Sequence, residues 1–202
     1  MDDGHSLGLT MWPWEHAAVG YLAWSLLVHA VRRRPPTGAE AVVVVLASVS
    51  PDLVDKPLGW EFGVFSSGYG AAHSVFFAVP IALGVTHFLS ERGKRGVGAA
   101  FAVGYLSHLP GDLLVGYLTE GRLPIERVLW PVRTVETTYT GGFSGTLLEY
   151  LRRYVADILE GDAGTAAVVG AVALFSCVAV WLVDGAPGVS ELRAAVTPNT
   201  RK

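Results

Sequence analysis

The sequence contains little charge. Asp, Glu, Lys and Arg make up only 16% of its 202 residues, and the formal net charge is −3. This weak charge, without any stretch of interleaved basic and aromatic residues, gives no basis for nucleic-acid binding. Cysteine is nearly absent, since Cys177 is the only one. A disulfide within the chain is therefore excluded, and the apolar neighbours of Cys177 favour a packing role.

Apolar residues are correspondingly abundant. They make up 51% of the chain, and the mean hydropathy is +0.41. These values are high for a soluble protein and typical of a polytopic membrane protein. Residues 1–10 lack the basic end and apolar core of a removable signal peptide, so we interpret them as a disordered leader. Met11 is an alternative start of the chain.

Helix-sized apolar segments dominate the rest of the chain. They cover residues 12–31, 37–54, 71–89, 97–118 and 163–183. The second is short, because its apolar part at about 1.5 Å per residue does not cross about 30 Å of hydrocarbon. We predict an all-α polytopic membrane protein, with about five transmembrane or membrane-embedded helices in one domain over residues 11–185. A soluble bundle with the same buried helices is the alternative.

Polar segments separate or follow these helices. Residues 56–70 are rich in glycine and aromatic residues and predict a loop. A longer polar loop covers residues 119–162, and within it residues 145–159 predict an amphipathic helix. Residues 186–202 predict a polar C-terminal tail.

The basic residues indicate an orientation. Arginines at positions 32–34 and basic residues at positions 92–95 follow the first and third helices. Because consecutive helices alternate in direction, both clusters lie on one side, which the positive-inside tendency makes cytoplasmic. The chain is therefore predicted to be a multi-pass protein of the cell membrane. The loop over residues 119–162 then lies on the extracytoplasmic side.

A histidine and an aspartate interrupt the fourth apolar segment. His108 and Asp112 are four residues apart, so on a helix their side chains project from the same face. Both are costly in an apolar setting unless a partner satisfies them. A divalent cation is one such partner, and a hydrogen bond between a neutral His108 and Asp112 is the other.

Similar residues occur at one end of other segments. With alternating helix directions, the residues expected at the extracytoplasmic end are His16, Asp52, Asp55, His73, His108 and Asp112. The division into apolar segments did not require these six residues to lie at the same end. It predicts that these polar residues form one site.

Short motifs around these residues carry a family resemblance. In chain order they are Trp14-Glu15-His16, Pro51-Asp52-Leu53-Val54-Asp55, Ala72-His73-Ser74, Ser107-His108, Asp112-Leu113-Leu114 and Leu129-Trp130-Pro131. Their order and spacing resemble the LexA-binding, inner-membrane-associated metal-dependent hydrolases, the YdjM-like group. The resemblance covers about residues 11–131. It implies a polytopic membrane protein with a divalent metal site.

A remoter similarity is to the helical zinc-dependent phospholipase C fold, which orders an early His, an Asp, a His and then His-x-x-x-Asp. It implies a set of metal ligands in this chain, namely His16, Asp52, His73, His108 and Asp112. The chain departs from that fold's pattern because His108 is its last histidine. One or two metal ions are therefore expected instead of three.

Histidine and carboxylate ligands suit Zn²⁺ first, with Mn²⁺ or Fe as alternatives. Asp55 and Glu15 are candidates for a general base or for a residue that orients a ligand. The alternative for both is a solvated carboxylate at a helix end. Lys56 is a candidate contact for a substrate phosphate, and its alternative is an ordinary interfacial lysine.

The sequence thus predicts a membrane-bound metal-dependent hydrolase that acts on a phosphoester or lipid-linked substrate at the extracytoplasmic interface. The lipid bilayer is its expected surroundings. Two alternatives remain open. One is a non-catalytic scaffold or regulatory protein with a structural metal, and the other is an ion or solute transporter, in which buried ionisable groups mark a pathway.

Overall fold

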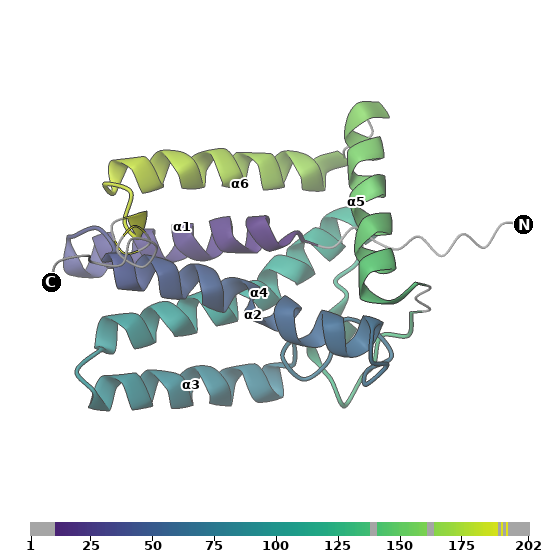
Figure 1. Cartoon of the computed structure of the whole chain (residues 1–202), viewed down its shortest axis with the longest axis horizontal. Coiled ribbons are helices and arrows are strands. Elements are labelled where there is room, and N and C mark those ends of the chain that lie inside the picture. The colour runs from purple at the N-terminus through teal and green to yellow at the C-terminus, as the bar shows by residue number, and fades with distance from the viewer. Residues whose placement is uncertain (1–10, 138–140, 161–163, 190, 192, 194–202) are drawn as a thin grey trace, which may run out of the picture.

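The computed structural model describes residues 11–137, 141–160, 164–189, 191 and 193. Within these residues every regular element is helical, which confirms the all-α class (Figure 1). The elements are α1 (Pro13–Arg32), α2 (Gly38–Trp60), α3 (Val75–Glu91), α4 (Arg95–Glu120), the 3₁₀ helix η1 (Ile125–Val128), α5 (Gly142–Glu160) and α6 (Gly164–Val183). The predicted leader and most of the predicted tail lie outside the described residues.

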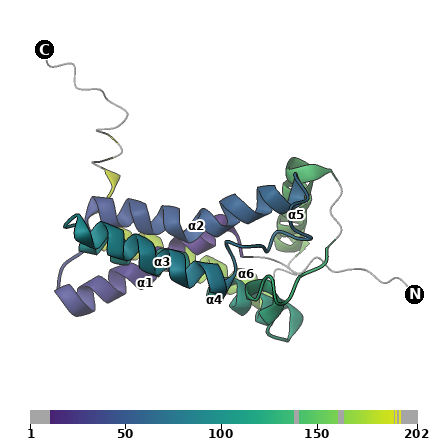
Figure 2. The ribbon, with the colours of Figure 1, turned by 90° about the horizontal axis from the view of Figure 1, so that it is seen from below.

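The long helices share one direction in space. In Figures 1 and 2, α1, α2, α3, α4 and α6 run along the long axis of the molecule, and α5 lies across one end. Helix α4 packs against α1, α2, α3 and α6 and so occupies the centre. The polar side chains of His108 and Asp112 on α4 are therefore buried among other helices.

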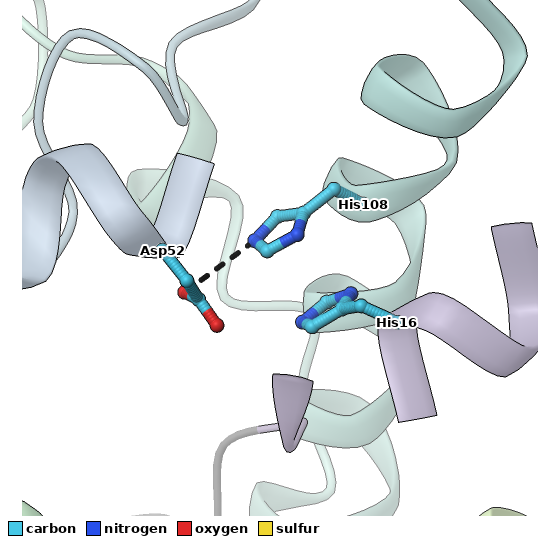
Figure 3. A group of neighbouring side chains, drawn as sticks. All are labelled: His16, Asp52 and His108. Carbon is cyan, nitrogen blue, oxygen red and sulfur yellow. Dashed lines mark ion pairs between the residues drawn. The ribbon is translucent and has the colours of Figure 1, made fainter. Parts of the chain in front are cut away.

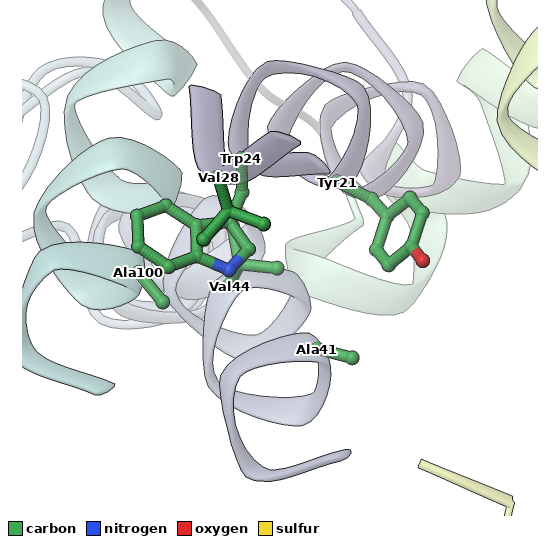
Figure 4. Packing of buried hydrophobic residues seen from close by; sticks show 6 residues of the cluster. All are labelled: Tyr21, Trp24, Val28, Ala41, Val44 and Ala100. Atoms are coloured by element: carbon green, nitrogen blue, oxygen red, sulfur yellow. The ribbon is translucent and has the colours of Figure 1, made fainter. Parts of the chain in front are cut away.

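The main apolar core joins the first two helices to α4 (Figure 4). Its buried members are Tyr21, Trp24, Val28, Ala41, Val44 and Ala100. Large residues come from α1, whereas α4 contributes a small one. This distribution lets α2 and α4 approach closely.

Gly104 lies at a close contact between α2 and α4. A Cβ at this position would lie 2.4 Å from the backbone oxygen of Val44 and 3.1 Å from the Cβ of Ala47. Backbone cannot move aside as a flexible side chain can. Only glycine therefore fits between these helices.

We expect Gly104→Ala to destabilise the protein by about 1–3 kcal/mol, because the added methyl group overpacks the α2–α4 contact. The matched control is Gly84→Ala in α3, where an added Cβ meets nothing within 4 Å. That substitution is expected to leave stability unchanged or raise it by up to about 1 kcal/mol, since alanine favours helix. Thermal unfolding in detergent measures both. Equal melting temperatures for the two variants would contradict the prediction.

Helix α2 extends further than predicted. The sequence predicted its end at residue 54 and a loop over residues 56–70, because those residues are rich in glycine and aromatic side chains. The structure instead continues the helix through Pro51 and Pro57 to Trp60. Pro51 has no N–H for the carbonyl of Ala47, and the hydroxyl of Ser50 donates to that carbonyl instead at 2.8 Å. The prediction of a loop at residues 56–60 is therefore wrong.

Helix α3 begins later than predicted, at Val75 instead of residue 71. Ser74 is its N-cap, and the Ser74 hydroxyl accepts a hydrogen bond from the backbone N–H of Phe76 at 3.3 Å. His73 therefore lies in the turn before the helix. This turn allows the His73 backbone as well as its ring to make specific contacts.

Among the described residues, α6 is the one helix long and apolar enough to cross a membrane by length and composition, and α3 is a shorter apolar helix. The outward side of α6 is apolar, with Phe175 78% exposed and Val172 59% exposed. Such a surface suits contact with lipid. The finer prediction of about five spans stays a prediction.

The C-terminal end of α6 is tied to α1 by Asp184. The carboxylate of Asp184 accepts hydrogen bonds from the hydroxyls of Tyr21 and Ser25, both at 2.7 Å. The ring of His29 lies 2.7 Å from the other carboxylate oxygen. These contacts lie toward the opposite end of α1 from His16, so they hold α6 in place without touching the polar site.

Candidate metal centre

Four segments meet at one end of the bundle. Helix α1 contributes His16, α2 contributes Asp52, the turn before α3 contributes His73, and α4 contributes His108 and Asp112. All five side chains are buried, none more than 4% exposed. The structure therefore brings together the whole ligand set implied by the sequence.

The potential donor atoms lie close together. His73 Nε2 lies 3.3 Å from Asp52 Oδ1, and His108 Nε2 lies 3.4 Å from Asp112 Oδ2. His16 Nε2 lies 3.3 Å from Asp112 Oδ1. Neighbouring ligands on a tetrahedral zinc ion with bonds of about 2.0–2.1 Å are about 3.3–3.4 Å apart. The spacing therefore matches that of a ligand shell.

Two overlapping groups have mutual donor distances within 4.8 Å. One is His16, Asp52 and His108, shown in Figure 3, and the other is His73, His108 and Asp112. His108 belongs to both groups, and its ring stacks on that of His16 with centroids 3.6 Å apart. The two groups therefore form one continuous cluster of donor atoms that meets at His108.

The second ring nitrogen of His108 fixes its tautomer. His108 Nδ1 lies 2.7 Å from the backbone oxygen of Ser48, which only accepts hydrogen bonds. His73 Nδ1 lies 2.8 Å from a carboxylate oxygen of Asp55, which also accepts. Each Nδ1 therefore carries the proton, and in the neutral ring each Nε2 presents a lone pair. The two Nε2 atoms face each other at 3.0 Å, so either one of them carries a proton and donates it to the other, or both bind a shared cation.

A single proton does not satisfy the whole cluster. Both ring nitrogens of His16 and both carboxylate oxygens of Asp112 are buried without a hydrogen-bond partner among the described residues. Unpaired buried polar atoms are costly, and those of carboxylates are the costliest. A divalent ion that several of these atoms bind together removes the cost. The residues therefore fit a metal.

Electrostatics around His73 favour positive charge. Burial lowers the pKa of this histidine, but the neighbouring carboxylates of Asp52 and Asp55 outweigh burial, so its pKa is raised above the ordinary value. Without a metal, the site therefore attracts a proton. Metal binding would release that proton.

Asp55 lies behind His73. Its carboxylate accepts hydrogen bonds from the backbone N–H groups of Gly70, Ala72 and His73 at 2.9–3.1 Å, besides the His73 ring. Asp55 is fully buried, so the alternative of a solvated carboxylate does not apply. Of the two predicted roles, the contacts favour orienting a ligand, and the role of general base stays a prediction.

Glu15 caps its own helix. One of its carboxylate oxygens accepts the backbone N–H of Trp12 at 2.8 Å, and the side chain is buried. The other oxygen lies against α6, where a Cβ on Gly170 would be 2.1 Å from it. A catalytic role for Glu15 stays a prediction, because these contacts describe a helix cap and a packing surface.

Lys56 belongs to α2 and pairs with the site. Its ammonium group lies 2.7 Å from Asp52 Oδ2. The His73 ring lies nearer the other carboxylate oxygen, Asp52 Oδ1. The side chain is only 10% exposed. It is therefore not the exposed interfacial lysine that the sequence left as an alternative.

Two neighbours of the site had no sequence signal. Arg127 of η1 is buried, and its guanidinium donates to the backbone oxygen of Asp112 at 3.4 Å. The ring of Tyr69 packs edge-on against His73 with centroids 5.1 Å apart. Burial raises the pKa of Tyr69 well above its ordinary value, and the charge of Asp112 adds to this, so Tyr69 stays protonated. In the sequence, both resemble ordinary loop residues.

Apolar helices around a buried cluster of histidines and carboxylates define a helical membrane-protein class with a candidate metal site. The chain belongs to the family described as YdjM inner membrane protein, whose family model matches residues 11–186. This confirms the resemblance seen in the motifs and the association with an inner membrane. No curated protein and no solved structure matches the chain. The similarity to the phospholipase C fold stays a prediction.

Proposed function

We propose that this protein is a metal-dependent hydrolase that acts on a phosphoester of a lipid-linked substrate at the extracytoplasmic face of the membrane. The observation that carries the proposal is the pair of inward-facing Nε2 atoms of His73 and His108, 3.0 Å apart between buried carboxylates. Such a set suits Zn²⁺, with Mn²⁺ or Fe as alternatives.

The residues divide into two roles. The ligands are His16, Asp52, His73, His108 and Asp112, all buried at one end of the bundle. Asp55 and the Ser48 carbonyl hold the two facing rings, so that both Nε2 atoms point inward. A metal held there would supply Lewis acidity for the activation of water and the polarisation of a phosphoryl group.

The position of α5 supports a lipid-linked substrate. This helix lies across the same end of the bundle and contacts α2 (Figure 1). Its exposed side chains include large apolar ones, with Leu148 66% and Leu159 80% exposed. A helix of this kind lies in the membrane interface with its apolar side in lipid. The site beneath it is then reached from the bilayer surface.

One observation favours a second function, that of a scaffold with a structural metal. Five side chains surround the site, whereas a catalytic zinc ion keeps an open position for water. If all five bind one ion, no open position remains. A bound metal without turnover on any phosphoester would support this second function.

The test is the metal content of detergent-purified protein. We expect near-stoichiometric Zn, Mn or Fe in the wild type and its loss in His108→Ala and Asp112→Ala, each of which removes a buried donor. The control is His87→Ala, which removes an exposed histidine of α3. Circular dichroism checks that the helices remain. A folded wild type without metal, even after incubation with these ions, would overturn the proposal.

A further inference from the structure

A cavity of about 230 Å³ lies beside the candidate metal centre. It is enclosed by the start of α1, the second half of α2 and one side of α5. Its apolar walls include Trp12, Trp60, Phe143, Leu147 and Tyr150. The rings form a continuous surface, because Trp60 stacks on Tyr150 with centroids 5.7 Å apart. The walls therefore suit an apolar ligand.

The cavity has one polar end, formed by Asp52 and Lys56. Asp52 Oδ1 lies among the candidate ligands, while Asp52 Oδ2 pairs with the Lys56 ammonium at 2.7 Å. An ammonium has three N–H donors, and Asp52 Oδ2 takes one of them. A cation therefore marks the boundary between the apolar cavity and the metal centre. Phosphate is a group that a metal ion and a lysine ammonium can bind together.

We propose that this cavity holds the apolar chain of the substrate and that Lys56 contacts its phosphate. The substrate class is a lipid phosphate with a single chain next to the phosphate. This inference rests on the proposed function, because the metal centre is where the phosphoester would react.

The size of the cavity argues for one chain. Pockets that enclose a whole drug-sized molecule measure about 300–1,000 Å³, and this cavity is smaller. It therefore holds the first segment of one chain. Leu53 lines the cavity and is 64% exposed, so a longer chain leaves the protein past this residue into the surrounding lipid.

Helix α5 decides which chains fit. Phe143, Leu147 and Tyr150 follow a spacing of four and three residues, which places them on one side of the helix. Leu148 lies one position further and is 66% exposed. The same helix thus faces the cavity on one side and lipid on the other.

Photoaffinity labelling in nanodiscs of neutral lipid tests the inference. The probe is an alkyl phosphate with a photoreactive diazirine near the phosphate, and adducts are mapped by mass spectrometry. We expect adducts within residues 57–60 and 143–150. Dodecyl phosphate should suppress them, whereas dodecanol, inorganic phosphate and the two-chain lipid phosphatidic acid should not. Adducts elsewhere, or equal competition by dodecanol or phosphatidic acid, would overturn the inference.

Matched variants locate the binding. Leu147→Trp fills the cavity, and Lys56→Gln removes the ammonium that contacts the phosphate. Each should reduce labelling about tenfold or more, which corresponds to a loss of about 1.4 kcal/mol of binding free energy or more. Leu148→Trp, on the exposed side of α5, and Lys56→Arg, which keeps the charge, should retain labelling. Equal labelling of Leu147→Trp and Leu148→Trp would overturn the inference.

Metal content of each variant separates the two proposals. Normal metal with lost labelling in Leu147→Trp supports the cavity as the chain site. Specific labelling of a wild type that binds no metal would overturn the proposed hydrolase and leave the chain site standing. Normal metal content and turnover with no labelling of the cavity would support the proposed hydrolase and overturn the chain site.

Discussion

Removing the metal is expected to lower the free energy of unfolding by about 4 kcal/mol when free metal is at about a thousand times its dissociation constant. Without an ion, the carboxylates of Asp52 and Asp112 stay buried, and only the neighbouring histidines and Lys56 balance their charge. Thermal unfolding in detergent, with a chelator and then with Zn²⁺ restored, measures the effect.

The controls for this experiment come from the same helices. Asp112→Ala should show little response to Zn²⁺, because it lacks a donor that faces His16, His73 and His108. His87→Ala should respond as the wild type does. A wild type whose melting temperature is unchanged by chelator and by added Zn²⁺, Mn²⁺ and Fe²⁺ would contradict the prediction.

Replacing Asp55 is expected to affect both folding and metal binding. Asp55→Ala leaves three buried backbone N–H groups without an acceptor, at about 1–3 kcal/mol each, and is expected to prevent stable folding. Asp55→Asn keeps one acceptor oxygen but no longer fixes the proton on His73 Nδ1. Metal affinity should fall by about 10–100-fold, as for other residues that orient a ligand. Competition with a coloured zinc chelator measures this affinity.

Asp184→Asn is the matched control for Asp55→Asn. Asp184 is also a buried carboxylate with several side-chain partners, but these lie toward the opposite end of α1. Its replacement should lower the melting temperature and leave zinc affinity unchanged. If Asp55→Asn binds zinc as tightly as Asp184→Asn does, Asp55 does not orient His73.

The sequence predicted much of this site, because polar residues are conspicuous in apolar helices. His108 and Asp112 stand out in this way, and helix direction alone places His16 at the same end. The contacts that orient the rings were not predictable. The partner of His108 is a backbone carbonyl, which has no sequence signature.

The errors in the helix boundaries have a local cause. The glycine and aromatic residues after residue 55 predicted a loop, but α2 continues through Pro57 to Trp60. At Pro51 the Ser50 hydroxyl satisfies the carbonyl of Ala47 that the proline leaves free. The predicted loop included Lys56. The cavity beside it was also beyond prediction, since Trp60 and Tyr150 meet only through the folding of distant segments.

The site also explains why span prediction from hydropathy is difficult here. Buried polar residues such as His16, Asp52 and Asp112 lower the hydropathy of α1, α2 and α4. Helix α6 has no buried polar residue in its span, and it is long and apolar enough to cross a membrane. These polar groups face one another and not lipid. Partners on neighbouring helices compensate them in part, and a bound ion would compensate the rest.

The close contact at Gly104 has a chemical consequence. Gly104 and His108 are one helical turn apart on α4, and Val44 and Ser48 are one turn apart on α2. The same helix crossing that excludes a side chain at Gly104 thus sets how near the Ser48 carbonyl comes to the imidazole. Interhelical distance and coordination geometry are therefore coupled. A folded variant at Gly104 is expected to change which ion the protein prefers, although this position touches no ligand atom.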